Sequence, residues 1–435
     1  MIIFLCLSML FIFAAYKNLK AMFIFYMAFK MIGLQFMCIK YTPPALSMET
    51  FLNIYFVFVF WKRGLLKQYF SSFKLFPLKR YFIISLISIG LSSIFSIMPF
   101  NSTINTIIMT LLNDYLIVII FWFYVNTREE ICLFIKSCMI VLIVSYIFGI
   151  YEFITNTNPF LDIIRGNVSE DLLLGKFYDT GERLGLRRIN AFFVSPNNFI
   201  YGAFVTMILF VYNKYIKPPF KYSIIFALLS FLLILMANSR TVLISSIIIM
   251  SPLLFAFKSK SIKIATCVII LFIISSPFIM QYASNITSVL DSSSSAEIEG
   301  SSVMGRMMQF EGSLELMMKS PIIGNGIESI TYFMSDKFDW RWIIFGTESI
   351  WMKLMIERGI LGILSYCFLF VDLITKLKVG KDKTMFIIML GYLCAHTMSS
   401  LPGFSLSYFL IVMLCLYKIK NFNYAYRNNY NPQTY

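Results

Sequence analysis

Charged residues are scarce in this chain of 435 residues, where Asp, Glu, Lys and Arg together make up 14%. Apolar residues make up 59%, and the mean hydropathy is +0.77. Soluble globular domains carry about 25% charged residues. The composition therefore excludes the soluble globular class and indicates a multi-pass membrane protein.

Several chemical signatures are also missing. Gly324-Asn325-Gly326 lacks the lysine and the spacing of a phosphate-binding loop. There is no HExxH motif and no Gly-x-Ser-x-Gly motif. The eight cysteines lie in apolar runs without ligand-like spacing. We therefore expect neither nucleotide-driven transport nor metallohydrolysis, and no disulfide, metal or other cofactor.

Apolar runs that approach the length of a membrane span recur along the whole chain. They begin near Ile2, Ala21, Met48, Tyr81, Ile104, Ile131, Phe192, Lys221, Thr241, Ile262, Thr347, Thr384 and Phe404. The first run is short and Lys30 interrupts the second. At about 20 residues a span, these runs predict an all-α integral membrane protein of about 12–13 transmembrane helices. We expect one polytopic membrane domain over residues 1–435.

Positive charge marks one side of the predicted membrane. The net charge of +15 resides mostly in four short connections, at about residues 62–80, 214–221, 258–263 and 376–383. Such loops are cytoplasmic, so the charge reports topology rather than nucleic-acid binding. Two long loops, at about 155–190 and 282–345, then face outward. The second contains a serine tract, an amphipathic run from Met307 to Lys319 and a turn at 321–326, and we expect it to be a working part.

Arginines recur where spans begin on the outer side, at positions 187, 188, 240 and 306. Arg240 lies in a tight hairpin between two spans. The planar guanidinium group binds phosphate oxygens with two parallel hydrogen bonds and keeps its charge, so these side chains suit a diphosphate. The alternative is that they extend to the interface or bind lipid headgroups without specificity.

Other polar residues have two interpretations each. Glu348 opens a helix and is either a general base or a charge that complements the helix dipole. Asn197 and Asn198 either bind a polyol or form an ordinary helix start.

Three further sites lie inside the predicted spans. Asp114 lies midway through its span, as a functional group or as a partner in an interhelical hydrogen bond. Glu357-Arg358 precedes Gly359, which predicts a break in the helix, and the two side chains are candidates for an ion pair. His396, the single histidine, has a structural interpretation.

Four segments, taken in order, resemble the bacterial O-antigen polymerases and the related O-antigen ligases. They are Arg188–Asn197, with the pattern Arg-x-x-Ala-Phe-Phe-x-x-Pro-Asn, Ser239-Arg240, Arg306–Gly326, which ends in Ser-Pro-Ile-Ile-Gly-Asn-Gly, and Thr347–Gly362. Ligases of this family usually carry a histidine in the outward segment before the last of these helices. Here Glu348 occupies about that place, which favours a polymerase.

The resemblance implies a glycosyltransferase that joins undecaprenyl-diphosphate-linked repeat units into O-antigen, capsule or related surface polysaccharide. The reaction would occur on the outer face of the bacterial cytoplasmic membrane. Arg240 and Glu348 would be catalytic, and Arg187, Arg188, Arg306, Asn197 and Asn198 would bind substrate. Expected partners are the lipid-linked oligosaccharide, the bilayer and a chain-length regulator.

Two other functions remain open. A ligase would move finished glycan to lipid A–core or to a protein. A flippase would move the same lipid-linked glycan across the membrane, although the paired halves that are typical of transporters are not evident here.

Overall fold

The computed structural model describes residues 2–32, 38–40, 46–159, 182–183, 186–192, 196–213, 222–237, 239–255, 303–333, 347, 349–398 and 404–429. Helices dominate these ranges. The strands described in them form two short antiparallel pairs, β1 (Cys38–Lys40) with β2 (Leu46–Ser47), and β3 (Glu182–Arg183) with β4 (Leu186–Arg187). The structure confirms the all-α membrane class.

The first half of the chain forms helices that start close to the predicted spans. They are α1 (Ile2–Lys17), α2 (Leu19–Ile32), α3 (Met48–Lys62), α4 (Leu65–Ser71), the 3-10 helix η1 (Phe73–Leu75), α5 (Lys79–Ile94), α6 (Phe100–Thr110), the π-helix η2 (Leu111–Leu116), α7 (Ile117–Tyr124) and α8 (Arg128–Thr155).

The second half contains α11 (Pro196–Asn213), α12 (Ser223–Met236), α13 (Arg240–Phe255), α15 (Val303–Lys319), α16 (Ser329–Phe333), α18 (Ile350–Thr375), the 3-10 helix η3 (Val379–Lys381), α19 (Lys383–Met398) and α20 (Phe404–Asn429). The span expected near Phe192 corresponds to α11, whose described residues begin at Pro196, and proline is favoured in the first helical turn. The amphipathic run at 307–319 lies in α15, as predicted. The run near Ile262 lies outside the described residues.

Among the described residues, three helical segments are long and apolar enough to cross a membrane. They are Phe100–Tyr124, Arg128–Thr155 and Ile350–Thr375. Shorter apolar helical stretches are Ser8–Lys17, Phe199–Tyr212, Ser223–Met236 and Thr241–Pro252. The number of 12–13 spans therefore stays a prediction.

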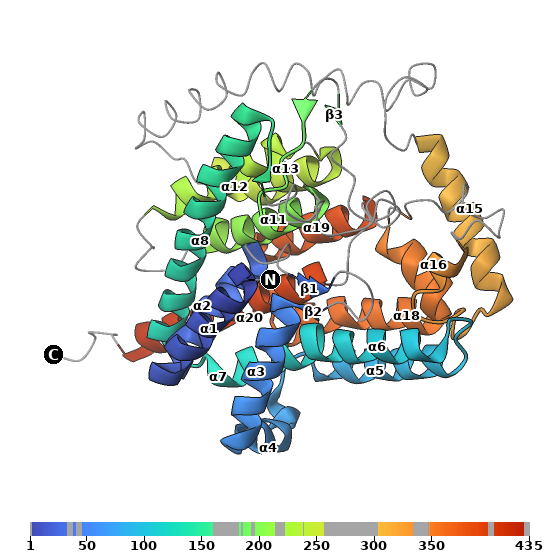
Figure 1. Ribbon diagram of the computed structural model, residues 1–435, viewed down its shortest axis with the longest axis horizontal. Helices are drawn as coiled ribbons and strands as arrows, with labels where there is room; N and C mark the ends of the chain where they lie inside the picture. The colour runs from blue at the N-terminus through green and yellow to red at the C-terminus, as the bar shows by residue number, and fades with distance from the viewer. Residues whose placement is uncertain are drawn as a thin grey trace.

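Helices from distant parts of the sequence pack side by side in one bundle (Figure 1). α5 lies along α18, α2 along α8, α13 along α19, and α11 contacts both α12 and α20. All side chains from Phe199 to Val211 are buried, as are those from Ser407 to Leu416. A helix that is apolar on all sides belongs inside a bundle, so α11 and α20 form its core.

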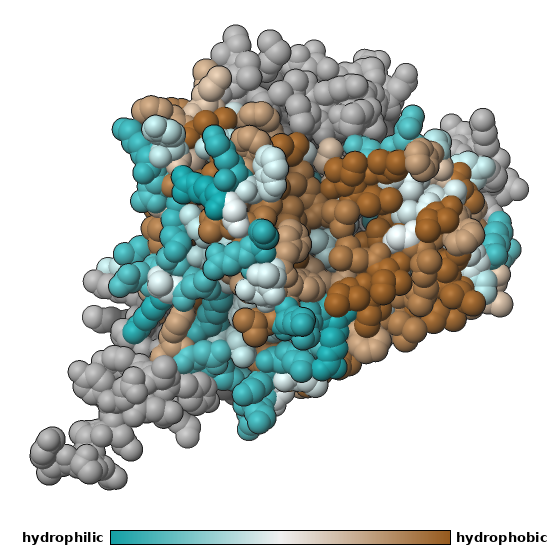
Figure 2. Space-filling model, turned by 90° about the horizontal axis from the view of Figure 1, so that it is seen from below, coloured by the Kyte–Doolittle hydropathy of each residue, from teal (hydrophilic) through white to brown (hydrophobic). Residues whose placement is uncertain are grey.

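A broad apolar surface covers the side of the bundle formed by α5 and α6 (Figure 2). The exposed side chains include Ile83, Leu86, Ile87, Leu91, Ile94, Phe100, Ile104 and Ile108. An apolar surface this continuous requires an apolar partner. In a membrane protein, lipid chains provide it.

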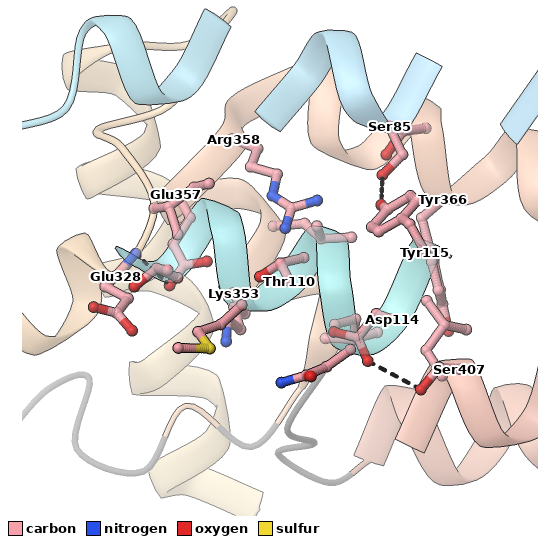
Figure 3. A pocket seen from close by; sticks show the side chains of 18 of the residues that line it. Ser85, Thr110, Asp114, Tyr115, Glu328, Lys353, Glu357, Arg358, Tyr366 and Ser407 are labelled. Atoms are coloured by element: carbon pink, nitrogen blue, oxygen red, sulfur yellow. Dashed lines mark hydrogen bonds between the residues drawn. The ribbon is translucent and has the colours of Figure 1, made fainter. Parts of the chain in front are cut away.

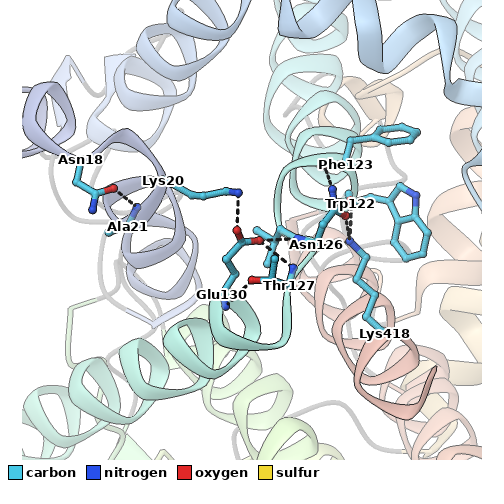
Figure 4. Close-up of polar contacts among 10 residues, drawn as sticks. Asn18, Lys20, Ala21, Trp122, Phe123, Asn126, Thr127, Glu130 and Lys418 are labelled. Carbon is cyan, nitrogen blue, oxygen red and sulfur yellow. Dashed lines mark hydrogen bonds and ion pairs between the residues drawn. The ribbon is translucent and has the colours of Figure 1, made fainter. Parts of the chain in front are cut away.

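The connection between α7 and α8 is bonded to two other helices, α2 and α20 (Figure 4). Thr127 caps α8 by accepting from the backbone N of Glu130 at 3.2 Å, and the Glu130 carboxylate accepts in return. Glu130 also forms an ion pair with Lys20 of α2. Lys418 of α20 donates to Asn126 Oδ1 at 2.9 Å and to carbonyl groups of the α7 end. This end of the bundle is therefore fixed by charge-assisted hydrogen bonds.

α18 is broken at Gly359, as the sequence predicted. Gly359 has φ 58° and ψ −149°, which no helix accommodates. Such a break leaves backbone carbonyl and N–H groups without intrahelical partners.

The turn at residues 320–326, between α15 and α16, supplies those partners. Its four backbone hydrogen bonds with α18 run from Asn325 N to Ile356 O at 2.9 Å, from Gly326 N to Glu357 O at 3.1 Å, from Ile360 N to Pro321 O at 2.9 Å and from Leu361 N to Ile322 O at 3.1 Å. The turn and α18 pack so closely that position 324 has no room for a side chain, because a Cβ on Gly324 would lie 2.3 Å from Arg358 N. The segment that was predicted to face outward is thus joined to the broken helix.

We predict that Gly326→Ala destabilises the protein by about 2 kcal/mol or more. Gly326 has φ +106°, and an added Cβ would lie 2.2 Å from Ser96 Oγ. The midpoint of thermal unfolding in detergent measures the effect. Gly90→Ala is the matched control, because nothing lies within 4 Å of a Cβ added there. Equal midpoints for the two variants would contradict the described contact.

Candidate functional site

Glu357 and Arg358 end the first half of α18 and face in different directions. The Glu357 carboxylate accepts from the backbone N of Glu328 at 3.1 Å, and its carbonyl accepts from Ser92 Oγ at 2.5 Å. Arg358 Nε is buried without a hydrogen-bond partner among the described residues. The prediction of an ion pair between Glu357 and Arg358 is therefore wrong. Adjacent residues on a helix do not face each other.

Arg358 points into a cavity of about 620 Å³ (Figure 3). α3, α5, α6, η2, α18 and α20 form its walls, together with Ile327 and Glu328. Its uncharged polar lining comprises Thr50, Tyr81, Ser85, Ser102, Asn105, Thr106, Thr110, Asn113, Tyr115, Ser365, Tyr366 and Ser407. The size is that of a small-molecule site, about 300–1,000 Å³, and these polar side chains share the lining with apolar ones.

The charged residues of the cavity are mostly acidic. Carboxylates come from Glu49, Asp114, Glu328 and Glu357, and cationic groups from Lys353 and Arg358. Glu49 forms an ion pair with Lys30, which does not line the cavity, and Lys30 Nζ lies 3.0 Å from Glu49 Oε1.

Asp114 lies on the π-helical turn η2 and faces the cavity (Figure 3). Its Oδ1 accepts from Ser407 Oγ of α20 at 2.9 Å. The interhelical hydrogen bond that the sequence suggested is thus formed. π-helical turns within α-helices are frequent at functional sites, and this one brings a carboxylate into the cavity from an apolar span.

A buried polar network supports the wall behind Asp114. Lys30 Nζ donates to Asn113 O at 2.7 Å. Asn53 Nδ2 donates to Asn113 Oδ1 at 2.7 Å, and Tyr26 OH donates to Asn53 Oδ1 at 2.7 Å. Buried polar groups of this kind are tolerated when they are satisfied. The network therefore fixes η2 in place.

The segment that carries Arg188 is a second polar region, away from these cavity walls. Arg188 is 2% exposed, and its Nε donates to Ala237 O at 3.2 Å. Ala237 ends α12, and α13 begins at Arg240. The first of the four segments that carry the family resemblance therefore contacts Ala237, two residues before the second segment, Ser239-Arg240.

Glu152 of α8 holds this segment and was missed in the sequence. Its Oε2 accepts from Asn190 N at 3.0 Å and from Ala191 N at 2.7 Å. Asn158 Nδ2 donates to Ala191 O at 3.1 Å. The sequence did carry a signal for this role, because Glu152 is a carboxylate near the end of an apolar span.

The other predicted site residues are placed only in part. Arg187 ends β4, Asn197 and Asn198 lie in the first turn of α11, and Arg240 begins α13, but their side chains lie outside the described residues, as does Glu348 altogether. Arg306 is half-buried on α15, which packs against α18. The convergence of these side chains stays a prediction.

The cavity itself was also missed, although α6 carried a signal. Ser102, Asn105, Thr106, Thr110 and Asn113 recur at helical spacing within a span and line one wall. Such a stripe in an apolar helix predicts a polar neighbour. His396 contributes no lining, since its Nδ1 lies 2.7 Å from Tyr366 OH inside the bundle.

The fold defines a polytopic helical membrane protein with a cavity inside its bundle that polar and charged side chains help to line. Residues 225–367 match the family model Wzy_C, described as O-antigen ligase. The matched part runs from α12 into α18 and includes the α12–α13 hairpin, the turn at 320–326 and the break at Gly359. The match confirms the resemblance to the O-antigen polymerase and ligase family, whose reactions are of the glycosyl-transfer type. No curated protein matches the chain.

We predict that Glu152→Ala destabilises the protein by about 2–5 kcal/mol, because two buried backbone N–H groups lose their acceptor. Glu152→Gln keeps one acceptor oxygen and is expected to lose less. Thermal unfolding of the purified protein measures both changes. Glu129→Ala is the control on the same helix: this exposed carboxylate is worth at most about 1 kcal/mol at the helix start. A loss no larger than that of the control would refute the anchoring role of Glu152.

Proposed function

We propose that the chain is a polysaccharide polymerase that joins undecaprenyl-diphosphate-linked repeat units on the outer face of the cytoplasmic membrane. The nonreducing hydroxyl of a new unit attacks the anomeric carbon at the reducing end of the growing glycan. A glycosidic C–O bond forms, the C–O bond to the diphosphate breaks, and undecaprenyl diphosphate leaves. The product is O-antigen, capsule or a related surface polysaccharide.

The contact between Arg188 and Ala237 carries this proposal. It joins two arginine-bearing segments that lie far apart in the sequence, at the side predicted to face outward. Arg188 is held by the backbone of the hairpin that leads into Arg240. The contact therefore supports one shared site for the two segments.

The proposed roles follow the charge that develops in the reaction. Negative charge grows on the leaving diphosphate, and fixed guanidinium groups stabilise it most at that moment. Arg240 is proposed for this catalytic role, with Arg187, Arg188 and Arg306 as binding groups. Glu348 accepts the proton of the attacking hydroxyl, and Asn197 and Asn198 bind sugar hydroxyls. Arginine charge takes the place of a metal ion in this scheme.

Two observations bear on the choice between polymerase and ligase. The description of the matching family model favours a ligase. The position of the single histidine favours a polymerase, because His396 is 1% exposed and bonded to Tyr366. A buried and bonded imidazole does not suit the role of the outward histidine that ligases of this family usually carry.

Deleting the gene in its own host separates the candidate functions. We expect the surface glycan to shrink to a single repeat unit and its ladder on a gel to disappear. Long polymer left on its lipid carrier would indicate a ligase instead. Single units trapped on the cytoplasmic face would indicate a transporter.

We predict that Arg240→Ala lowers the rate of polymerisation by about 100-fold or more, as expected for removal of a group that stabilises charge in the transition state. Arg240→Lys keeps the charge and is expected to restore part of the ladder. The assay is complementation of the deletion strain, with equal membrane levels of each variant confirmed by immunoblot. Arg63→Ala is the control, because this arginine is exposed in the short predicted cytoplasmic connection. An unchanged ladder with Arg240→Ala would remove Arg240 from the mechanism.

A further inference from the structure

We propose that the cavity between α5, α6, α18 and α20 binds the sugar portion of the substrate, while the diphosphate binds outside it. This inference rests on the proposed function, because it assigns one part of a lipid-linked glycan to a particular site. It separates two chemistries that the substrate carries: uncharged hydroxyl groups at one end and a multiply charged diphosphate at the other.

The charge of the cavity argues against a diphosphate inside it. Asp114, Glu328 and Glu357 remain after Glu49 is paired with Lys30, and they outnumber the two cationic side chains. A diphosphate would meet net repulsion from these carboxylates. Sugar hydroxyls have the opposite preference, because they donate hydrogen bonds and carboxylates accept them.

The uncharged lining also fits a sugar. Asn105 carries donor and acceptor atoms, as adjacent hydroxyl groups require, and the oxygen atoms of the threonine and serine side chains can accept further hydrogen bonds. Arg358 adds a buried Nε that lacks a partner among the described residues. Phe82 and Leu354 supply apolar surface for the ring faces.

Other occupants fit less well. A prenyl or acyl chain would bury these amides and carboxylates without hydrogen bonds, which is costly. In the part of the chain that the structure describes, no group of three His, Cys, Asp or Glu side chains is arranged to hold a metal ion. Glu328 and Glu357 instead lie next to each other at one end of the cavity, apart from Asp114 (Figure 3).

The cavity also lies where a substrate from the outer face can reach it. Glu328 precedes α16, in the segment predicted to face outward, and Ile350 begins α18. Both line the cavity. Its walls therefore extend from the outer segment into the bundle, towards Asp114 on η2.

The test uses full-length protein purified in detergent and two probes. One probe is the phosphate-free oligosaccharide repeat unit released from the host's own surface glycan. The other is farnesyl diphosphate, a short analogue of the lipid diphosphate. Calorimetric titration measures the affinity of each variant for each probe, and unfolding midpoints confirm that the variants fold.

We expect Asn105→Ala and Asp114→Asn to weaken oligosaccharide binding by about tenfold or more, as for loss of a buried hydrogen bond. Asp114→Asn retains an oxygen that can accept from Ser407, so its fold is expected to persist. Asn101→Ala is the matched control: it lies one turn earlier on α6, exposed and outside the cavity lining. Binding of farnesyl diphosphate should change less than twofold in all three variants.

Three results would overturn the proposal. They are wild-type protein that does not bind the oligosaccharide, cavity variants that bind it as well as Asn101→Ala, and cavity variants that lose farnesyl diphosphate instead. None of these results depends on polymerisation. A ligase or transporter with this cavity would still bind the oligosaccharide, so the gel of the deletion strain tests the proposed function separately.

Discussion

The contact between the turn at 320–326 and the break in α18 is the constraint on which the candidate site depends. A broken helix at membrane depth is stable only when other groups satisfy its backbone. Here the turn provides four backbone hydrogen bonds, and its glycines let two backbones approach closely. Glu357 and Arg358 precede the break, so the same contact sets where their side chains lie. The turn thereby couples the segment that was predicted to face outward to the wall of the cavity.

The second constraint is the cost of polar groups in an apolar bundle. Lys30 is fully buried, and it pairs with the Glu49 carboxylate and donates to the Asn113 carbonyl group. Asn53 in turn donates to the Asn113 side chain. Replacing such a network by apolar side chains is often neutral or stabilising, so stability alone does not account for it. Its position directly behind the cavity wall accounts for it better, because a wall that offers polar groups to a ligand must hold them still when the ligand is absent.

Local features were predictable from the sequence, whereas features that join distant helices were not. The break at Gly359 and α15 follow from glycine and from helical periodicity, which are read within a few residues. The cavity requires α5 and α6 to meet α18 and α20, and nothing local to Ser407 indicates that it faces Asp114 from the other end of the chain. The prediction of an ion pair at 357–358 was wrong because neighbours in sequence point to different sides of a helix. Glu152 was missed because its partners are backbone groups almost forty residues away.

The two polar regions have opposite character, and the proposed reaction requires that difference. A glycosyl transfer from a lipid diphosphate brings together a leaving group that gains negative charge and a hydroxyl group that loses a proton. Guanidinium groups favour the first and would repel the cationic character that builds on the reacting sugar. Carboxylates favour hydroxyl donors and repel the diphosphate. The proposed reaction therefore fits two separate regions of opposite charge better than one mixed site. The arginines predicted at the hairpin and the acidic cavity beside α18 have those charges, and the matched family segment from α12 into α18 includes parts of both.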